Sequence, residues 1–495
     1  MLALVMDLQE SAAWRYHQAT NHSVESLRRN RHTLDWANQP RPYKRYAQPL
    51  QQVALPRELP QSSMPALQAL SSSASPAGER VPDLPLISLL LQLSAGITKV
   101  LHFPQGDMPF RAAACTGALY HIDLYVVCGE LPDLPAGVYH FDVENVALSR
   151  LREGDFRGVL VEATAQHEHL GHAPATIVAS STWWRNSWKY QSRTYRHSFW
   201  DSGTILANLL ALATAHDLPA SLVLGFADAP VNALLDLDPA REAALELVPL
   251  GWTAAEPPPA ASVLPLHVPV QAYSFHEVDY PLIYEAHEAT SLSSAAEVRA
   301  WQGACHSERR AKNPQPASPP EPIESVIRRR GSAREFEQTP IGLEALEMML
   351  AAATVPPPND WGAPLSEPYL IVNAIDGLPS GSYRYASGAL EPLRLGDYRG
   401  IAGRLDLGQD LAADAAVNVY FLADLRDIIG RLGERGYRAA QLDGSLTAGK
   451  LYLAAYALGA AATGLTFFDD EVSEFFGTDK SVMFLLAIGN KRRRR

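Results

Sequence analysis

Leu134-Pro-Ala-Gly-Val-Tyr139 decides the fold of this chain, because a close copy, Leu378-Pro-Ser-Gly-Ser-Tyr383, follows 244 residues later. Further pairs keep the same order at an offset of 242 residues: Gly154-Asp-Phe-Arg-Gly158 with Gly396-Asp-Tyr-Arg-Gly400, Arg193-Thr-Tyr-Arg196 with Arg435-Gly-Tyr-Arg438, and Asp201 with Asp443. Biased composition could produce one such match, but not the shared spacing. The sequence therefore predicts a duplicated unit of about 170–250 residues.

Each copy shows the same predicted elements in the same order. The Leu-Pro-x-Gly-x-Tyr segment is typical of a hairpin turn, because proline fixes φ and glycine reaches positive φ. A strand, a long Ala/Leu helix and a last strand follow: residues 175–179, 204–216 and 245–250 in the first copy, and residues 416–420, 446–458 and 483–488 in the second. Apolar residues surround each long helix, so we expect it to be central and buried. Strands and helices interleave without strict alternation, which predicts an α+β fold with a mostly antiparallel or mixed sheet.

The remaining segments predict how the copies are joined. Residues 256–269 and 313–322 are rich in proline, which is typical of loops and semi-rigid linkers. We therefore expect four parts: an N-terminal extension (1–80), a first unit (81–255), a linker (256–320) and a second unit (321–495).

Composition excludes several classes of protein. The chain has 495 residues, of which 47% are hydrophobic, so wholesale disorder is excluded. The net charge of −12 argues against a nucleic-acid surface. Three cysteines are too few for a disulfide framework, and no signal peptide or membrane span is evident, so we expect a cytoplasmic protein. We expect no metal site, because His167-Glu168-His169 is followed by Gly171 where an H-E-x-x-H motif needs histidine.

The two copies differ at three places. Only the second contains the basic run 328–336, in which Arg330, Ser332 and Arg334 alternate and share one face of an extended segment. Guanidinium and hydroxyl groups suit a phosphate and neighbouring polyol oxygens. Only the first contains the small-residue run 112–118, which lets the backbone approach a flat ligand. A solvated charge cluster and a close-packed turn are the alternative interpretations.

The third difference is Lys189-Tyr190 in the first copy, where the second has Arg431-Leu432. The pair begins the string Lys-Tyr-x-x-Arg-x-Tyr-Arg, which resembles the motif of SagB/ThcOx-type dehydrogenases. Residues 325–336 resemble the Arg-x-Ser-x-Arg-x-Phe opening of the nitroreductase superfamily. Residues 111–120 resemble its Arg-x-x-Pro-Ser-x-Gly-x-Leu-Tyr loop, with Ala114-Cys115 in place of Pro-Ser. The N-terminal Tyr16-His and Asn21-His-Ser resemble tandem members of the group.

The resemblance implies that FMN binds where two units meet, one supplying the basic opening and the other the small-residue loop. The chain then looks like a pseudo-dimer of two fused nitroreductase-like units with one intact flavin site. A mirror site, formed by residues 27–31 and the region 355–360, is expected to be vestigial. The implied cofactor-binding residues are Arg111, Cys115, Thr116, Gly117 and Asn208 of the first copy, and Arg330, Ser332, Arg334, Thr466, Phe467, Lys491 and Arg492 of the second.

The resemblance also implies an activity, which is the dehydrogenation of azolines to azoles in ribosomally made peptides. Lys189 and Tyr190 would be the acid/base pair, and a cyclodehydratase would be the partner enzyme. One alternative is an NAD(P)H-dependent reductase of nitro compounds, quinones or flavins. Another is a flavin-binding or cofactor-free pseudo-enzyme that acts as a partner protein. The substrate is expected to be a small molecule or a peptide, and the chain either a monomeric pseudo-dimer or a homo-oligomer.

Overall fold

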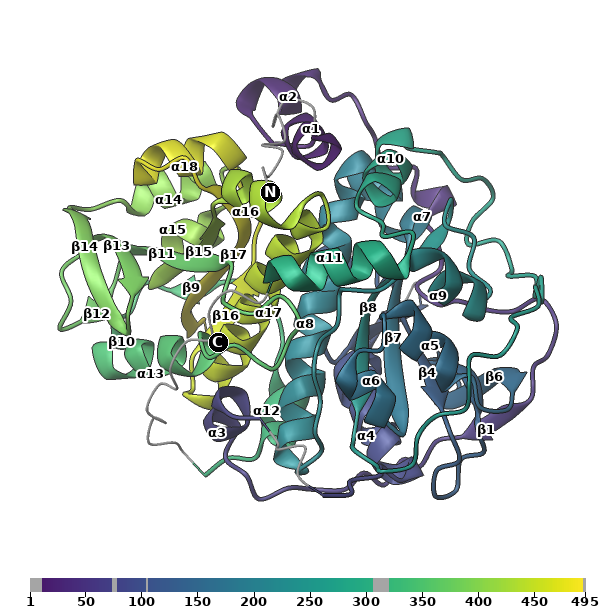
Figure 1. The fold of residues 1–495 in the computed structure, drawn as a ribbon. Coiled ribbons are helices and arrows are strands. Elements are labelled where there is room, and N and C mark those ends of the chain that lie inside the picture. The colour runs from purple at the N-terminus through teal and green to yellow at the C-terminus, as the bar shows by residue number, and fades with distance from the viewer. Residues whose placement is uncertain (1–10, 74–77, 104–105, 306–319, 493–495) are drawn as a thin grey trace.

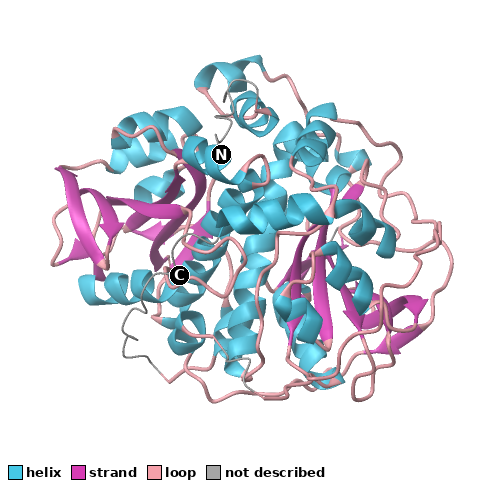
Figure 2. Cartoon of the chain, viewed as in Figure 1, coloured by secondary structure: helices cyan, strands magenta, loops and turns pink. Residues whose placement is uncertain are grey.

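Two large antiparallel sheets flank a central pair of long helices, α8 (Thr194–Ala215) and α17 (Gly436–Ala457), in the computed structural model (Figure 1). The structure describes residues 11–73, 78–103, 106–305 and 320–492. Figure 2 shows the strands in two groups on opposite sides of the central helices. The prediction of an α+β fold with two similar units is confirmed. No described helix is both long and apolar enough to cross a lipid bilayer.

The first copy forms a six-stranded sheet in the order β1-β6-β5-β4-β7-β8. Its strands are β1 (Gln52–Ala54), β4 (Ile122–Cys128), β5 (Gly137–Asp142), β6 (Ala147–Glu153), β7 (Ala175–Thr182) and β8 (Glu242–Leu250). A separate hairpin consists of β2 (Ile97–Phe103) and β3 (Gly106–Arg111). The helices of this copy besides α8 are α3 (Ala66–Ser71), α4 (Leu84–Ala95), α5 (Arg157–Ala163), α6 (Glu168–His172), α7 (Trp183–Tyr190) and α9 (Asp228–Leu234), of which α3, α4 and α7 contact α8.

The second copy repeats this arrangement with a sheet in the order β14-β13-β11-β15-β17-β16, to which β9 adds by pairing with β17. Its strands are β9 (Phe336–Glu337), β11 (Ser366–Val372), β13 (Gly381–Ala386), β14 (Ala389–Leu395), β15 (Val417–Ala423), β16 (Ala461–Gly464) and β17 (Ser481–Lys491). A small parallel pair is β10 (Ile341–Gly342) with β12 (Ile375–Asp376). The helices of this copy besides α17 are α12 (Ile323–Arg329), α13 (Leu343–Ala353), α14 (Arg399–Leu405), α15 (Asp410–Asp414), α16 (Leu425–Leu432) and α18 (Asp469–Phe476), of which α12, α13 and α16 contact α17.

The repeated tyrosines explain why the Leu-Pro-x-Gly-x-Tyr segment recurs. The Tyr139 hydroxyl donates a hydrogen bond to the carbonyl of Pro135 at 2.8 Å. Tyr383 does the same to the carbonyl of Pro379 at 2.6 Å. Each tyrosine is buried, so this bond satisfies its hydroxyl and fixes the turn that starts β5 or β13.

The two long helices touch at small residues. A Cβ on Gly203 would lie 2.8 Å from the backbone nitrogen of Leu446, and a Cβ on Gly449 would lie 2.8 Å from the Cβ of Ala207. Gly203 faces its own counterpart, Ser445, at the offset of 242 residues. Residues that contact their own counterparts lie near a twofold axis. The helices therefore form the centre of a pseudo-dimer, and both begin about ten residues before the apolar pattern predicts.

The repeat also reaches the segments on either side of the first unit. The extension contains α1 (Ala12–Ala19) and α2 (Val24–Arg29), and the linker contains α10 (Pro281–Ala289) and α11 (Ala295–Cys305). In the extension the sequence His17-Gln-Ala-Thr20 matches His287-Glu-Ala-Thr290 in the linker. The histidine carbonyl and the threonine hydroxyl of each string accept hydrogen bonds from an arginine near the start of a long helix, Arg196 for the first string and Arg438 for the second. The boundaries at 80, 255 and 320 stay predictions.

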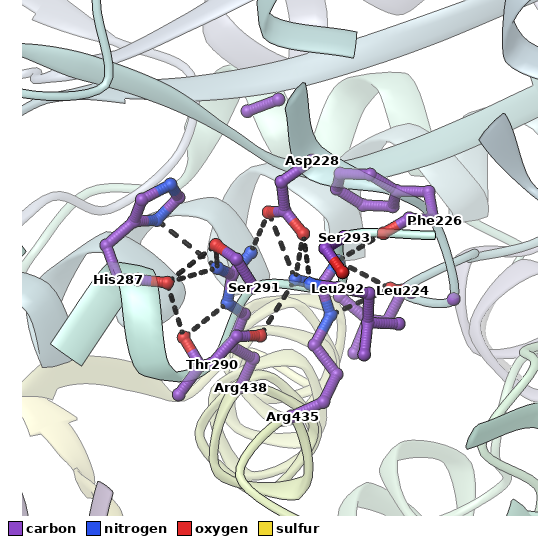
Figure 3. Close-up of polar contacts among 12 residues, drawn as sticks. Leu224, Phe226, Asp228, His287, Thr290, Ser291, Leu292, Ser293, Arg435 and Arg438 are labelled. Carbon is purple, nitrogen blue, oxygen red and sulfur yellow. Dashed lines mark hydrogen bonds and ion pairs between the residues drawn. The ribbon is translucent and has the colours of Figure 1, made fainter. Parts of the chain in front are cut away.

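We call the contacts around Asp228 the linker clasp. Arg435 and Arg438 each bind a carboxylate oxygen of Asp228 at 2.8 Å (Figure 3). Arg438 Nε also donates to Thr290 Oγ1 at 2.8 Å, and Arg435 Nη1 donates to the carbonyl of Thr290 at 3.0 Å. Asp228 further accepts the N–H of Leu292 at 2.9 Å. Because the arginines and Asp228 belong to different copies, the clasp joins the two units.

The extension forms a matching N-terminal clasp around Asp469. Arg193 and Arg196 bind its carboxylate at 2.9 and 2.6 Å. Arg196 Nε donates to Thr20 Oγ1 at 3.0 Å, and Arg193 Nη1 donates to the carbonyl of Thr20 at 2.5 Å. Asp469 accepts the N–H of His22 at 2.8 Å. The two clasps therefore share one design, and they adjoin each other, because the Tyr195 hydroxyl lies 2.5 Å from Thr290 Oγ1.

Both aspartates are buried, and their charge depends on the arginines. Burial by itself would raise the pKa of Asp228, but Arg435 and Arg438 lower it to about 2. Burial likewise opposes the charge of Asp469, and Arg193 and Arg196 hold its pKa well below the ordinary value. Each clasp is therefore an ionised, hydrogen-bonded network inside the protein.

Candidate active site

Arg330 connects the two copies at the end of α12. Its Nε donates to the carbonyl of Ala112 at 2.9 Å, and its Nη2 lies 3.4 Å from the carbonyl of Arg111. Its guanidinium lies 5.2 Å from the ring centre of Tyr452. Among the described residues, no group pairs with the buried Nη1. A buried donor without a partner is costly, so this atom fits an anionic ligand at the junction of the copies.

Further cations and a hydroxyl surround Arg330. Ser332 and Arg334 are exposed, and Ser332 Oγ accepts a hydrogen bond from Tyr452 at 2.9 Å. Lys491 pairs with Phe336 in the ladder between β17 and β9, and the N–H of Arg492 donates to the carbonyl of Glu335 at 3.2 Å. The structure thus brings the predicted basic opening next to the end of the last strand.

The small-residue loop of the first copy is anchored on Asp201 of α8. Asp201 Oδ1 accepts the N–H and the hydroxyl of Thr116 at 2.8 and 2.7 Å. Cys115 Sγ donates to Asp201 Oδ2 at 3.0 Å and accepts the N–H of Tyr120 at 3.1 Å. Burial and the carboxylate of Asp201 raise the pKa of the Cys115 thiol, so it stays protonated. Cysteine can therefore serve in this loop as a serine would.

Gly117 and Tyr190 lie against each other. Gly117 has φ +63°, and a Cβ there would lie 2.8 Å from the hydroxyl oxygen of Tyr190. Lys189 is half-buried at the end of α7, with its Nζ 5.2 Å from the ring centre of Tyr190. Desolvation and, after it, the charge of Arg334 lower the pKa of Lys189. The structure therefore places the Lys-Tyr pair of the first copy beside the basic opening of the second.

The turn at Thr466 and Phe467 lies between β16 and α18. Phe467 is buried against Trp200, with 5.7 Å between ring centres. Among the described residues, no acceptor pairs with the N–H of Thr466 or Phe467. Two unpaired amides at one turn can receive a ligand heteroatom, as the resemblance implies for the flavin.

Two predicted cofactor residues have other partners. The guanidinium of Arg111 is buried and donates to the carbonyls of Ile122 at 3.2 Å and Pro42 at 2.6 Å. Asn208 is buried and donates to the carbonyl of Leu93 at 2.9 Å. Both side chains support the loop and helix next to the site, and direct contact with a cofactor stays a prediction for them.

Two histidines belong to the site and are missing from the prediction. The ring of His197 lies 4.6 Å from the ring of Tyr190, and its Nδ1 lies 2.9 Å from Asn186 Oδ1. The imidazole of His22 lies beside Thr466. A comparison of the copies could have found His197, because its counterpart 242 residues later is Ala439.

The mirror site is closed by different residues than the sequence predicts. A cavity of only about 20 Å³ lies between the end of α3 and the run Val355-Pro-Pro-Pro358. Lys450, the counterpart of Asn208, donates there to the carbonyl of Val355, and burial lowers its pKa to about 7. Residues 27–31 do not line this cavity, so that prediction is wrong. They adjoin α7 instead, where Asn30 donates to Gln191 at 2.8 Å.

The donor set fits FMN. The unpaired nitrogen of Arg330 and the neighbouring cations suit a phosphate, and the glycine at position 117 leaves the backbone open to a flat ring. Among the described residues, no group of three or more histidine, cysteine, aspartate or glutamate side chains could hold a metal ion. Cys115, Cys128 and Cys305 are free thiols.

Comparison with known proteins identifies the family. The model of the nitroreductase family matches residues 94–252 and 327–490, which together exceed half of the chain. The chain belongs to the nitroreductase family. Family members are oxidoreductases that generally depend on FMN. The predicted tandem organisation is confirmed, because the match occurs once in each copy.

Individual relatives agree with this assignment. A crystal structure titled as a nitroreductase from Anabaena variabilis is 26% identical, covers 97% of this chain and 100% of its own, and has a TM-score of 0.78. The trifolitoxin-processing protein TfxB of Rhizobium leguminosarum bv. trifolii is 28% identical over 35% of this chain. A protein of Methanocaldococcus jannaschii named as a nitroreductase is 23% identical over 29% of this chain and 70% of its own. The chain spans about half the length of TfxB.

Proposed function

We propose that this nitroreductase-family chain is an FMN-dependent dehydrogenase of SagB/ThcOx type, which oxidises azolines to azoles in ribosomally made peptides. The observation that carries the proposal is the position of Lys189 and Tyr190. They lie at the loop of Gly117, beside Arg334 of the other copy, and a simple nicotinamide-driven reductase has no need of them. One relative is named for processing trifolitoxin, and such a dehydrogenase would have a processing role.

The chain's own residues would divide the work. Arg330, Arg334 and Lys491 would hold the phosphate and polyol, and the amides of Thr466 and Phe467 would face the ring. When bound, FMN would accept a hydride equivalent from a ring carbon of the azoline. The neighbouring carbon then gives up a proton, and one ring double bond forms.

Lys189 is the base in this proposal. Its lowered pKa increases the fraction of neutral amine, which can take the proton from the substrate carbon. Tyr190, with its hydroxyl at Gly117, would orient the substrate or relay the proton. We further propose a cyclodehydratase as partner, because it forms the azoline that this reaction consumes. A reducing, cytoplasmic compartment suits the three free thiols.

Flavin quantification tests the cofactor and the asymmetry together. We expect one FMN per chain, because the opening and the loop occur once each. Denaturing release and absorbance against protein concentration measure the ratio. A ratio near two would contradict the single composite site, and a colourless protein that takes up no FMN would favour the pseudo-enzyme.

Anaerobic bleaching separates the two enzyme classes. An azoline-containing peptide should bleach the flavin of a dehydrogenase, whereas NAD(P)H alone should bleach that of a nitro, quinone or flavin reductase. Rapid bleaching by NAD(P)H with no response to azoline peptides would overturn the proposed substrate class.

A further inference from the structure

The two clasps agree at most positions and differ at one that faces a ligand site. Thr20 and Thr290 occupy equivalent places, as do His17 and His287. Two residues after each threonine, the N-terminal clasp has His22 and the linker clasp has Leu292. Both backbones bind the clasp aspartate in the same way, so the duplication conserves the backbone and changes only the side chain.

His22 contacts the turn between β16 and α18. Its Nδ1 lies 3.4 Å from Thr466 Oγ1, and its ring lies next to the backbone of Phe467. Its carbonyl accepts the N–H of Asp469 at 3.1 Å. His22 therefore contacts three residues of this turn, Thr466 and Phe467 through its side chain and Asp469 through its main chain.

The imidazole is neutral in this position. Burial, followed by the charge of Arg193, lowers the pKa of His22 to about 3. Asp469 opposes the shift, and Arg196 adds to it. A neutral imidazole has one donor and one acceptor nitrogen, so it can donate to a backbone carbonyl and accept from a hydroxyl.

The mirror turn shows what happens without a histidine. There Asp360 accepts the N–H of Leu224 at 3.0 Å and that of Gly225 at 2.7 Å. These two residues are the counterparts of Thr466 and Phe467 at the offset of 242 residues. The mirror turn is thus fixed by a carboxylate that consumes its amides. His22 contacts the intact turn without binding its first two amides, so the amides of Thr466 and Phe467 stay free for a ligand.

We propose that His22 is a positioning residue, which holds the turn at Thr466 and Phe467 so that its two unpaired amides face the flavin ring. The proposal deepens the proposed function and rests on it for the identity of the ligand. The ordering of the turn is a property of the protein itself and can be measured without the flavin.

The test compares three variants with the wild-type chain. His22→Leu installs the residue of the equivalent position, so the clasp backbone should still form. His22→Asn restores a polar group that can reach Thr466. Leu292→Ala is the matched control, because it changes the same position of the linker clasp. Hydrogen exchange is measured on flavin-free protein at Phe468 and Asp469, whose N–H groups donate to the carbonyls of Leu405 and His22. FMN affinity and midpoint potential are measured by titration.

We expect amide exchange at the turn to rise and FMN affinity to fall roughly two- to tenfold in His22→Leu, as for the loss of one hydrogen bond. The midpoint potential should move with it, since the amides facing the ring change place. His22→Asn should recover part of each effect, and Leu292→Ala should leave all three unchanged.

Unchanged exchange, affinity and potential in His22→Leu would overturn the proposal, as would equal effects in Leu292→Ala. If wild-type protein binds no FMN, the proposed function fails. Exchange in the flavin-free protein then still decides whether His22 orders the turn. Should His22→Leu not fold, His22→Asn with Leu292→Ala gives the same comparison.

Discussion

Two equivalent turns of this molecule have opposite surroundings. The amides of Leu224 and Gly225 are bound by the carboxylate of Asp360, whereas the equivalent amides of Thr466 and Phe467 have no protein acceptor among the described residues. The turns connect equivalent elements and start equivalent helices, α9 and α18. The difference teaches that the duplication preserved the scaffold of both turns, while only the turn at Thr466 and Phe467 has amides free for a ligand.

The two clasps support the same conclusion, because they keep the contacts that stabilise the fold. Each clasp retains two arginines that bind one carboxylate. Each also retains a threonine that binds the arginines and a backbone N–H that donates to the carboxylate. Because the mirror site is closed, the clasp next to it cannot have been retained in order to bind a ligand there. The clasps therefore hold the two copies together, and we propose that the polar residues that differ between the two copies serve the chemistry.

The largest effect should come from breaking a clasp. Asp228→Ala and Asp469→Ala each leave two buried arginines without their counter-ion, which should reduce the free energy of unfolding by about 3–5 kcal/mol. Only Asp469→Ala should also weaken FMN binding, because Asp469 follows the intact turn directly. Urea denaturation and FMN titration of both variants measure this. Equal effects on FMN would remove the functional distinction between the two clasps.

The Lys-Tyr pair should affect the chemical step and little else. Lys189→Ala combined with Tyr190→Phe should slow substrate-driven flavin reduction by about 10²–10⁴, as for the loss of general acid/base catalysis. Folding, FMN content and reduction by dithionite should be unchanged. The control is Arg431→Ala, at the equivalent place in the second copy. A double variant that bleaches as fast as wild type would show that the pair has no catalytic role.

The basic opening should affect cofactor binding. Arg330→Ala removes the buried donor and should weaken FMN binding roughly ten- to a hundredfold, as for a lost charge-assisted hydrogen bond. Arg328→Ala is the control, because Arg328 is exposed on the same helix. Equilibrium dialysis of both variants gives the affinities. Wild-type affinity in Arg330→Ala would mean that its Nη1 does not bind the ligand.

The smallest effect should be on the pH dependence. The positive charge of Arg334 helps to lower the pKa of Lys189, after desolvation, and protonated Lys189 cannot act as a base. Arg334→Gln should therefore raise that pKa and move the rising limb of kcat/KM to higher pH, by less than about one unit because Arg334 is exposed. Assays at saturating FMN measure it. A shift to lower pH would contradict this assignment of the base.

Local patterns made much of the fold predictable. The recurring proline, glycine and tyrosine of the two turns act within a few residues, so their spacing exposes the duplication. The long helices were predicted too short because their first turns carry Arg193, Arg196 and their counterparts. Those polar side chains are buried in the clasps, and hydrophobic periodicity cannot register a buried charge whose partner lies in the other copy.

The sequence by itself determined the duplication, the α+β class, the basic opening and the position of Lys189-Tyr190, because each depends on short-range spacing and residue type. Only the tertiary structure decided which amides stay free, which residues close the mirror site, and that His22 reaches Thr466. The contact of His22 with Thr466 joins residues 444 apart in the sequence, and that of Asp360 with Leu224 joins residues 136 apart. They depend on how the two copies pack around α8 and α17, and no local pattern in the chain encodes that packing.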